Sequence, residues 1–411
     1  MHFRLAWKRE WTWIIGVFLS LRLIYSLIGA ITISGGLPVP LDENKYTTVI
    51  ANTLHTDPFS QSLVNVWLRW DTTWYIKIAY SGYANNDGSI AFMPLYPWLI
   101  KVAGFLLGGN LLLGAILISN LAGLMALILL YELACMEKKF KTNPMRSVLA
   151  LLVFPSAFFL FAAYSESLFL MLILAAWLCA RHKDWLAAGV LATLATLCRL
   201  QGILLIPVLI WLYLAAAAES WDLSPIAQIQ AIWSMLTTST GREKARSSLL
   251  HYSALAVILP GVPLLVYQAW LYNSNLGNIF KVHTTTWSIQ TVMPWEGFKL
   301  FVERLFSQQR VFIDYIDLGA LLLILGVCIF ATFHLDPAYS LYNWLNLSLF
   351  FMRGTPPHLL DGFNRFLLMV FPAFLVFGAI RNRPLAIILG SLSFIIQLFL
   401  LMGFLDWRWV A

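Results

Sequence analysis

The chain has 411 residues and a formal net charge of +7, with 60% hydrophobic residues and only 11% charged residues. This composition excludes an ordinary water-soluble core, so lipid is the expected solvent for most of the chain. In a soluble protein the positive charge would suggest nucleic acid, but here the basic residues lie mainly in short connections, where they set membrane topology. We therefore expect membrane lipids as partners and no nucleic acid.

Apolar runs of about 20 residues, the length that crosses roughly 30 Å of hydrocarbon, recur from Trp11 to Phe404. The first run follows basic Arg4, Lys8 and Arg9, but it is too long for a signal peptide and lacks a cleavage site. We expect an all-α polytopic protein with about eleven transmembrane helices in a single membrane domain over 1–411. The predicted spans are 11–34, 111–135, 147–163, 165–180, 185–198, 203–218, 250–272, 316–334, 338–352, 366–380 and 384–404.

The basic connections predict the orientation of these spans. With a cytoplasmic N-terminus, the basic segments 137–146, 181–184, 219–249 and 381–383 all lie on the cytoplasmic side. Two long connections, 35–110 and 273–315, then lie on the other side and hold most of the polar residues. Ala91–Leu107 is apolar enough to cross, but Pro94, Pro97 and Lys101 favour a helix at the membrane interface.

The first extracytoplasmic loop contains the leading candidate residue. Asp71, Trp74, Tyr75 and Ile78 have the i, i+3, i+4, i+7 spacing of a short amphipathic helix that begins near Asp71. A carboxylate at that end either caps the helix, which is worth about 1 kcal/mol, or faces a cavity as a base. Spacing alone leaves both interpretations open.

Other carboxylates of this loop have simpler explanations beside the functional ones. Asp42 and Glu43 could supply an acid–base or metal group, or could be solvated loop residues. Asp87 lies in the sequence Ala-Asn-Asn-Asp-Gly, which is typical of a turn.

Further polar residues interrupt the apolar runs. Glu166, in the sequence Ala-Tyr-Ser-Glu-Ser, either starts a helix or belongs to a polar site, and Arg199 and Gln201 near the next outer turn share this ambiguity. Arg22 lies in the middle of the first span, where an arginine is expected to have a partner or a ligand.

Cations gather at the predicted outer edges. Lys281 and His283 open the second long loop, and Arg353, His358 and Arg365 lie at a third outer edge. Together they could bind a phosphate or pyrophosphate group, although snorkelling explains any one of them equally well. The four cysteines lack metal-ligand spacing. The motifs of common nucleotide-binding folds are absent as well, so a donor substrate would have to be reached from the outer membrane surface, and a lipid-linked donor fits that location.

Several of these blocks resemble the PIG-V-type mannosyltransferases, which add the second mannose of GPI anchors and belong to the GT-C glycosyltransferases. The matching blocks are Arg69-Trp70-Asp71-(x)3-Tyr75-(x)2-Ile78-Ala79-(x)2-Gly82-Tyr83, Ala91-Phe92-(x)-Pro94-Leu95-(x)-Pro97, Phe154-Pro155-Ser156-Ala157-Phe158-Phe159, Ala163-Tyr164-Ser165-Glu166-Ser167-Leu168-Phe169, Arg199-(x)2-Gly202, Asn364-Arg365-Phe366 and Phe371-Pro372.

The resemblance implies a GT-C fold with a cytoplasmic N-terminus and a large first extracytoplasmic loop bearing interfacial helices and the catalytic acid. It implies a polyprenyl-phosphate-sugar donor, a lipid-linked or protein glycan as acceptor, and an inverting transfer of mannose with Asp71 as general base. Residues expected to contact the substrates are Trp70, Tyr75, Tyr164, Glu166, Arg199, Gln201, Lys281, His283 and Arg365.

Many GT-C enzymes have a closely spaced acidic pair in this loop, whereas Asp71 is followed by Thr72 and Thr73. The sequence therefore indicates no cofactor and no metal site, although it does not exclude a divalent metal. The expected location is the plasma membrane of a bacterium or the endoplasmic reticulum membrane of a eukaryote. Two other functions stay open: a transporter or flippase for an amphipathic lipid, and a non-catalytic subunit of a glycosylation complex.

Overall fold

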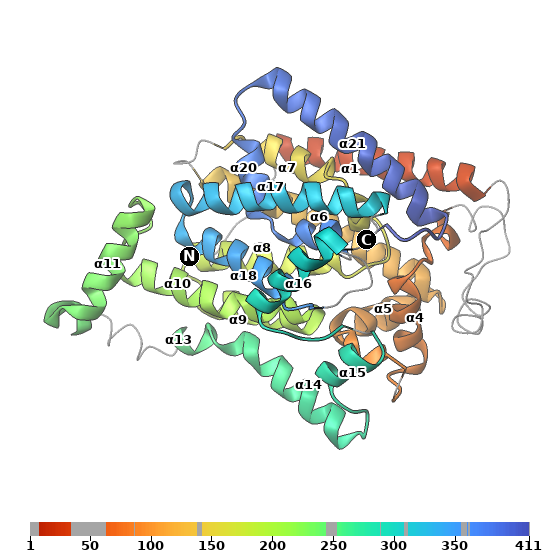
Figure 1. The fold of residues 1–411 in the computed structure, drawn as a ribbon, viewed down its shortest axis with the longest axis horizontal. Helices are drawn as coiled ribbons and strands as arrows, with labels where there is room; N and C mark the ends of the chain where they lie inside the picture. Colours follow the sequence, from red (N-terminus) through yellow and green to blue (C-terminus); the bar gives the residue numbers. More distant parts are fainter. Residues whose placement is uncertain are drawn as a thin grey trace. The chain divides into compact units, whose positions relative to one another are not determined.

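The computed structural model describes residues 8–33, 63–85, 87–137, 142–243, 253–287, 289–307, 311–354, 360 and 362–410. Regular structure in these ranges is helical (Figure 1), and the β-type pairing found there is an isolated bridge between Thr291 and Arg353. The chain forms two compact units. Unit 1 contains Met1–Tyr80, Leu99–Met171 and Phe377–Val410, and unit 2 contains Ser81–Trp98 and Leu172–Val376.

Unit 1 holds the first and last described helices. Its helices are α1 (Arg9–Ile33), α4 (Asp71–Ser81), α6 (Leu111–Met136), α7 (Pro144–Leu152) and α21 (Arg383–Leu405), with short 3-10 helices η1 (Asn65–Trp67) and η3 (Ala157–Leu160). The last residue of α4, Ser81, already belongs to unit 2, and three further helices contain a boundary between the units: α5 (Leu95–Leu106), α8 (Glu166–Arg181) and α20 (Pro372–Gly378).

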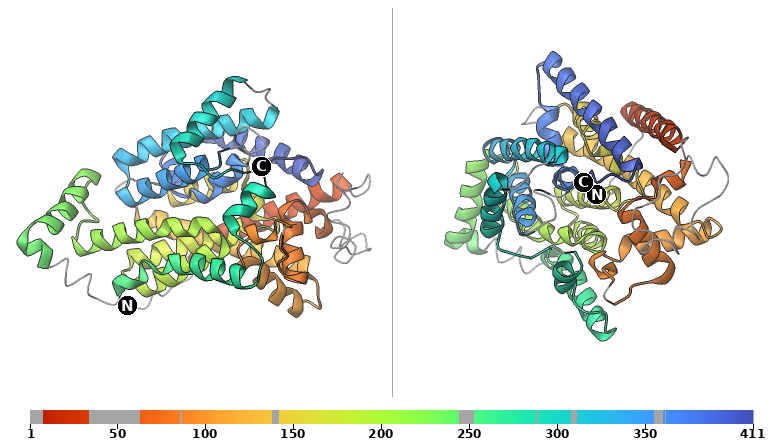
Figure 2. Two further views of the ribbon diagram at one scale, coloured as in Figure 1. Left: turned by 60° about the horizontal axis from the view of Figure 1, so that its bottom comes forward. Right: turned by 45° about the vertical axis from the view of Figure 1, so that its right-hand side comes forward.

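Unit 2 holds the helices of the central part of the chain. They are α9 (Trp185–Cys198), α10 (Leu205–Ala217), α11 (Pro225–Thr237), α13 (Ser253–Ala256), α14 (Val262–Asn273), α15 (Ile279–Thr285), α16 (Pro294–Ser307), α17 (Phe312–His334), α18 (Pro337–Phe351) and α19 (Phe363–Phe366), with η2 (Ser89–Ala91), η4 (Leu200–Leu204), η5 (Leu259–Gly261) and η6 (Leu367–Met369). Among them, α17 and α18 lie side by side (Figure 2).

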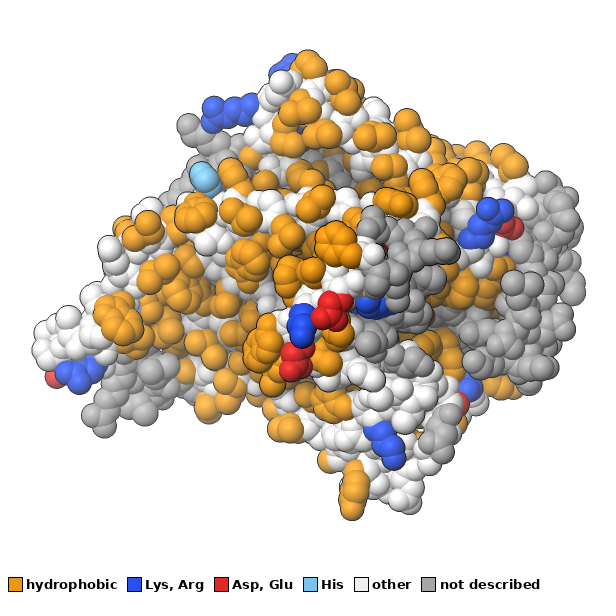
Figure 3. All heavy atoms as spheres, viewed as in Figure 1, with side chains coloured by type: hydrophobic (Ala, Val, Ile, Leu, Met, Phe, Trp, Pro, Cys, Tyr) orange, Lys and Arg blue, Asp and Glu red, His pale blue; other side chains and the backbone are white. Residues whose placement is uncertain are grey.

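Six described helical segments are long and apolar enough to cross a membrane. They are Arg9–Thr32, Leu111–Met136, Leu200–Ala217, Ser253–Asn273, Phe312–His334 and Arg383–Leu405. Hydrophobic side chains cover most of the face in Figure 3, and charged side chains on it are few. The protein is therefore an all-α, multi-pass integral membrane protein, as the composition predicts. The number of about eleven spans stays a prediction.

Two predicted spans are wrong as continuous helices. In 147–163, α7 ends at Leu152, because Pro155 cannot donate a backbone hydrogen bond and disfavours a helical residue before it. In 366–380, the helix that follows Phe366 is a 3-10 turn, and α20 begins only at Pro372. The helix predicted within 91–107 is observed as α5, whose 12 residues extend about 18 Å and are too short to cross; its position at the membrane interface stays a prediction.

The break after α7 leaves backbone carbonyls inside unit 1, and two side chains of α21 bind them. Gln397 Nε2 donates to the carbonyl oxygens of Leu152 at 3.0 Å and Phe154 at 2.7 Å. Ser393 Oγ donates to the carbonyl of Val153 at 2.7 Å. Buried backbone groups need such partners where water is excluded, so α21 makes the broken segment possible.

The rest of this segment is bound in the same way by α1 and α6. The carbonyl of Phe161 accepts hydrogen bonds from Arg22 Nη1 at 3.2 Å and from Asn120 Nδ2 at 3.0 Å. Ser119 Oγ donates to the carbonyl of Tyr164 at 2.7 Å. Residues 157–170 are all buried, so this irregular segment forms the core of unit 1.

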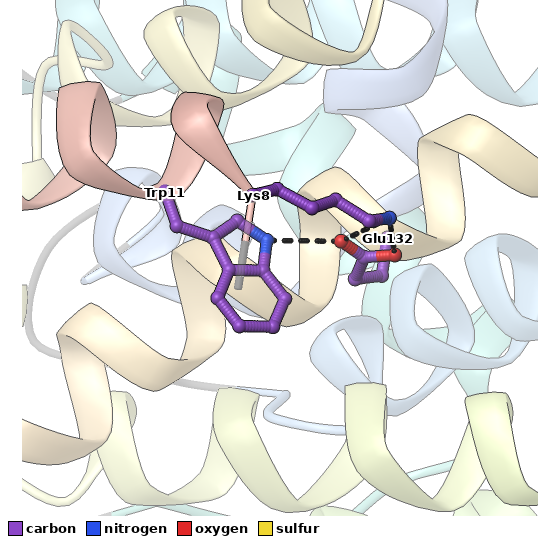
Figure 4. Close-up of polar contacts among 3 residues, drawn as sticks. All are labelled: Lys8, Trp11 and Glu132. Carbon is purple, nitrogen blue, oxygen red and sulfur yellow. Dashed lines mark hydrogen bonds and ion pairs between the residues drawn. The ribbon is translucent and has the colours of Figure 1, made fainter. Parts of the chain in front are cut away.

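An ion pair joins the chain just before α1 to α6 (Figure 4). Lys8 Nζ donates to both carboxylate oxygens of Glu132, at 2.8 and 2.6 Å, and Trp11 Nε1 donates to one of them at 2.9 Å. The carboxylate is largely shielded from solvent while the lysine is more exposed, so the pair and the indole together compensate the burial of Glu132.

Candidate active site

Helix α4 begins at Asp71, as the sequence predicts, but the turn that starts it was not foreseen. Trp70 precedes the helix with a φ of 48°, and its carbonyl accepts hydrogen bonds from the backbone N–H of Thr73 at 3.0 Å and from Thr73 Oγ1 at 2.7 Å. Trp70 therefore occupies the N-cap position and Asp71 the first helical position. A carboxylate there interacts favourably with the helix dipole.

The left-handed backbone of Trp70 is unusual for a bulky residue and costs about 1–3 kcal/mol. Its side chain packs against two rings that follow α21: the ring centroids lie 5.7 Å from Trp407 and 5.1 Å from Trp409. Trp407 itself has a φ of 57°. These aromatic contacts hold the turn that presents Asp71, and the sequence analysis missed them because no local pattern pairs residues so far apart.

Arg69 is a further residue that the sequence analysis did not assign to the site. Its buried guanidinium donates from Nε to the carbonyl of Leu405 at 2.8 Å and from Nη1 to the carbonyl of Leu68 at 3.0 Å, and it lies 5.0 Å from the ring centroid of Trp407. Burial lowers the pKa of the Arg69 guanidinium to about 9, and the Asp406 carboxylate opposes part of this shift. Arg69 thus anchors the Trp-Asp turn to the end of α21.

Two of the blocks singled out in the sequence meet at this turn. The hydroxyl of Tyr164 accepts from the backbone N–H of Asp71 at 3.2 Å and donates to the carbonyl of Arg69 at 3.3 Å. Thr72 Oγ1 donates to the carbonyl of Ala163 at 3.2 Å. These bonds bring together two blocks that are 93 positions apart in the sequence, so one site in unit 1 contains both blocks.

The same helix face continues the contact one turn further along α4. Tyr75 Oη and Ser165 Oγ are 2.7 Å apart, and the rings of Tyr75 and Tyr164 form an edge-on pair at 6.5 Å. Buried residues occur on most sides of α4, at 72, 73, 75, 76, 78 and 79. The helix is therefore more enclosed than the amphipathic surface helix that the spacing predicts.

Glu166 and Asp71 differ in exposure. Glu166 is the first residue of α8 and is fully buried, whereas Asp71 is partly accessible. A carboxylate in the first turn of a helix interacts favourably with the helix dipole, which fits the helix-start interpretation of Glu166. Its predicted contact with substrate stays a prediction.

Arg22 has the partners that an intramembrane arginine needs. Besides its bond to Phe161, it donates from Nη2 to the carbonyl of Leu63 at 3.3 Å, and its guanidinium lies 4.8 Å from the ring centroid of Trp67. These contacts confirm the expectation of a partner and make Arg22 a structural link from α1 to the segment before the Trp-Asp turn.

The remaining predicted site residues lie in unit 2. Arg199 Nε donates to Gln201 Oε1 at 3.0 Å, and these residues sit where α9 passes into η4. A Cβ on Gly202 would lie 2.3 Å from the backbone nitrogen of Thr196, so only glycine allows η4 to fold back on α9. This close approach explains why a glycine occupies position 202.

Of the other cations, Lys281 is exposed on α15 and His283 is half-buried on the same helix. Burial, and to a lesser degree the charge of Arg353, lower the pKa of His283 below its usual value. Arg365 lies in α19, next to Asn364, whose backbone N–H donates to Asp317 Oδ1 at 3.0 Å. The convergence of these residues with Asp71 on one substrate stays a prediction.

Three predicted residues, Asp42, Glu43 and His358, lie outside the described residues. Asp87 forms the predicted turn, because its Oδ1 accepts from the backbone N–H of Ser89 at 2.8 Å. Within the described ranges, no three or more His, Cys, Asp or Glu side chains are grouped so that they could hold a metal ion.

Residues 40–301 match the family described as Mannosyltransferase (PIG-V), which is more than half of the chain. The chain belongs to this family. The match contains both blocks of the Asp71 site, namely the Trp-Asp turn and the Tyr164 segment, whereas the PIG-V match ends well before Trp407 and Trp409. Trp407 and Trp409, which support the turn, thus lie outside the part of the chain that matches the family.

Two solved structures resemble this chain at low sequence identity. The crystal structure of ArnT from Cupriavidus metallidurans bound to undecaprenyl phosphate is 14% identical and gives a TM-score of 0.45 over 92% of this chain and 62% of ArnT. The Archaeoglobus fulgidus oligosaccharyltransferase in complex with Zn and sulfate is 13% identical, with a TM-score of 0.42 over 94% of this chain and 53% of that enzyme. The chain thus spans less than two thirds of either protein, and no curated protein matches it.

Proposed function

We propose that this protein is a membrane glycosyltransferase. In this proposal it transfers mannose from a polyprenyl-phosphate-linked donor to a hydroxyl group of a lipid-linked or protein glycan on the non-cytoplasmic face. The observation that carries the proposal is the contact between the Trp70-Asp71 turn and the Tyr164 hydroxyl, in a member of the PIG-V family. A partly accessible aspartate, whose backbone N–H is bound at a helix start by the buried Tyr164, suits a base that must meet an acceptor.

The chemical step would be a single inverting displacement. Asp71 takes the proton of the acceptor hydroxyl as its oxygen attacks the anomeric carbon of mannose. The bond between that carbon and the phosphate oxygen breaks, and the polyprenyl phosphate leaves with the electron pair. The contacts of Trp70 and Tyr164 with the backbone next to Asp71 would keep the carboxylate in one orientation during this step.

The leaving phosphate needs cations near the membrane surface. We assign this role to Arg199, Lys281 and Arg365, with Trp70, Tyr75, Tyr164, Glu166, Gln201 and His283 as further substrate contacts. The exposure of Lys281 supports its part in this role, because an ammonium group at the surface can donate to an anion. The hydrogen bond from Arg199 Nε to Gln201 Oε1 holds the Arg199 guanidinium in one orientation.

The test is a transfer assay with membranes that contain the protein, radiolabelled polyprenyl-phosphate-mannose and mixed lipid acceptors. Asp71→Asn keeps the size of the side chain and removes the base, so transfer should fall roughly 10²–10⁴-fold. Asp87→Asn is the matched control, because an asparagine Oδ1 can still accept from Ser89 and preserve the turn. Its transfer should equal that of the wild type.

Full transfer by Asp71→Asn would refute the mechanism. Label that crosses the membrane on an unmodified lipid, without transfer to an acceptor, would instead favour the transporter or flippase. Wild-type protein that supports transfer only together with another membrane protein, and regardless of Asp71, would indicate a non-catalytic subunit.

A further inference from the structure

Helix α11 carries large apolar side chains that are exposed and that the proposed mechanism does not use. Ile226, Ile229, Trp233 and Leu236 follow one another at intervals of three, four and three residues, so they lie on one face of the helix. Their exposed fractions are 68, 50, 68 and 39%. We call these four residues the α11 stripe. Apolar side chains of this size, exposed together, require a partner or an apolar solvent.

The two remaining sides of α11 differ from the stripe. One side is buried against other elements of unit 2 and contains Gln228, Ile232 and Met235. The other side is polar and exposed and contains Gln230, Ser234 and Thr237. The helix thus has a docked side, an apolar exposed side and a polar exposed side. A helix that lies in the plane of a membrane surface needs the last two together, one for lipid and one for water.

Gln228 fixes α11 beside the ends of neighbouring helices. Its Oε1 accepts from Trp211 Nε1 of α10 at 3.0 Å, and its Nε2 donates to the carbonyl of Ser220 at 3.3 Å and to Oδ2 of Asp336 at 3.0 Å. Ser220 follows the end of α10, and Asp336 lies between α17 and α18 as the N-cap of α18. In the predicted topology these helix ends lie on the cytoplasmic side.

Helix α11 also contacts α17, whose own exposed face is apolar. Helix α17 is one of the segments that could cross a membrane. It exposes Leu322, Ile329 and Phe333, which lie on one face at intervals of seven and four residues. Phe333 belongs to the last turn of α17. The apolar surface of α17 therefore reaches the end of the helix that α11 contacts, which places the edge of the hydrocarbon near α11.

The connection between α10 and α11 carries a second mark of the membrane interface. The Arg181 guanidinium and the Lys183 ammonium lie 5.4 and 5.7 Å from the ring centroid of Trp221. Tryptophan gathers where the hydrocarbon gives way to lipid head groups, and Lys and Arg are in excess just beyond it on the cytoplasmic side. Trp221 precedes Ser224, the N-cap of α11, by three residues. Helix α11 therefore begins close to this level.

We infer that α11 lies in the head-group region of the cytoplasmic leaflet, with the α11 stripe among the lipid acyl chains and its polar side in water. The 13 residues of α11 extend about 20 Å, which is too short to cross the bilayer. Phospholipid is the partner that fits, because Gln228 holds the helix beside a membrane-crossing helix whose exposed face is apolar. This inference concerns membrane contact and does not depend on the proposed function.

The test is spin-label accessibility in the full-length protein, reconstituted in phosphatidylcholine vesicles without its four native cysteines. Nitroxides are attached singly at Ile229→Cys and Trp233→Cys of the stripe, and at Gln230→Cys and Thr237→Cys of the polar side. Oxygen concentrates in lipid, whereas a water-soluble nickel chelate stays outside it. Stripe labels should therefore collide more with oxygen than with nickel, and polar-side labels should show the reverse. Leu322→Cys, on the exposed face of α17, is the lipid control.

Stripe labels that collide more with nickel than with oxygen would overturn the inference, because the stripe would then face water. Stripe labels shielded from both reagents would overturn it as well, because protein would then cover the stripe. Dipolar broadening between shielded labels would identify that protein as a second copy of the chain. Ile226→Cys replaces Trp233→Cys if that variant does not fold. A failed transfer assay would leave these results unchanged, so the inference and the proposed function can fail separately.

Discussion

Trp70 shows how a single backbone conformation can prepare a site. Its φ of 48° places the Asp71 N–H on the hydroxyl of Tyr164, and the rings of Trp407 and Trp409 oppose any return to an ordinary conformation. A non-glycine residue in this region is retained where its surroundings enforce it, which occurs often at functional sites. The turn, rather than Asp71 alone, is therefore the feature to test.

Tyr164→Phe tests the turn at its central hydrogen bonds. The variant leaves the Asp71 N–H and the Arg69 carbonyl without their partner, so the free energy of unfolding should fall by about 1–3 kcal/mol. Transfer per folded molecule should also fall, because Asp71 loses its fixed orientation. Thermal unfolding and the transfer assay measure the two effects, and Tyr80→Phe, at the 65% exposed end of α4, should change neither.

His283 predicts a pH dependence of stability. Burial lowers its pKa in the folded protein, so the unfolded chain binds the proton more readily between the folded value and about 6.5. Stability should therefore be complete above about pH 6.5 and decrease as the pH falls below it. Thermal midpoints from pH 8 to 5 should decline less in His283→Gln than in the wild type, whereas His182→Gln, at an exposed position, should keep the wild-type decline.

At the scale of elements, the broken segment between α7 and α8 depends on α21. Gln397 accepts from the hydroxyl of Tyr25 at 2.6 Å and donates to two carbonyls. Gln397→Leu therefore removes the hydrogen-bond partner of three buried polar groups. The free energy of unfolding should fall by roughly 2–5 kcal/mol. A thermal midpoint equal to that of Ser391→Ala, an exposed position on α21, would contradict this account.

At the scale of the whole molecule, the predicted orientation is open to direct measurement. In a background without the four native cysteines, Lys281→Cys should react with a membrane-impermeant thiol reagent in intact cells. Lys183→Cys should react only after permeabilisation, because the basic segment 181–184 is expected on the cytoplasmic side. Both side chains are exposed, so each cysteine can react if the reagent reaches its side of the membrane. Labelling of Lys183→Cys but not of Lys281→Cys in intact cells would reverse the predicted orientation, and equal labelling of both would contradict it.

The sequence predicted what depends on local pattern. Apolar length identified the membrane helices, and the spacing after Trp70 identified the start of α4. The prediction failed where a proline divides an apolar run. The composition of 147–163 is that of a continuous span, and the break in it is stabilised by Gln397, which is far away in the sequence. Of the candidate site, the ordered motifs supplied Asp71 and Tyr164, but the roles of Arg69 and Trp407 depend on contacts between distant residues, which no spacing encodes.

The anchoring of Arg69 to Leu405 also has a consequence for biosynthesis. The two residues are 336 positions apart, so at about 5–20 residues per second the ribosome makes Leu405 roughly 17–70 s after Arg69. During that interval the first loop has already crossed the membrane in the predicted topology, while its Trp-Asp turn lacks the rings that enforce it. A nascent protein would therefore be inserted well before it becomes competent for transfer, which delays activity until α21 is in place.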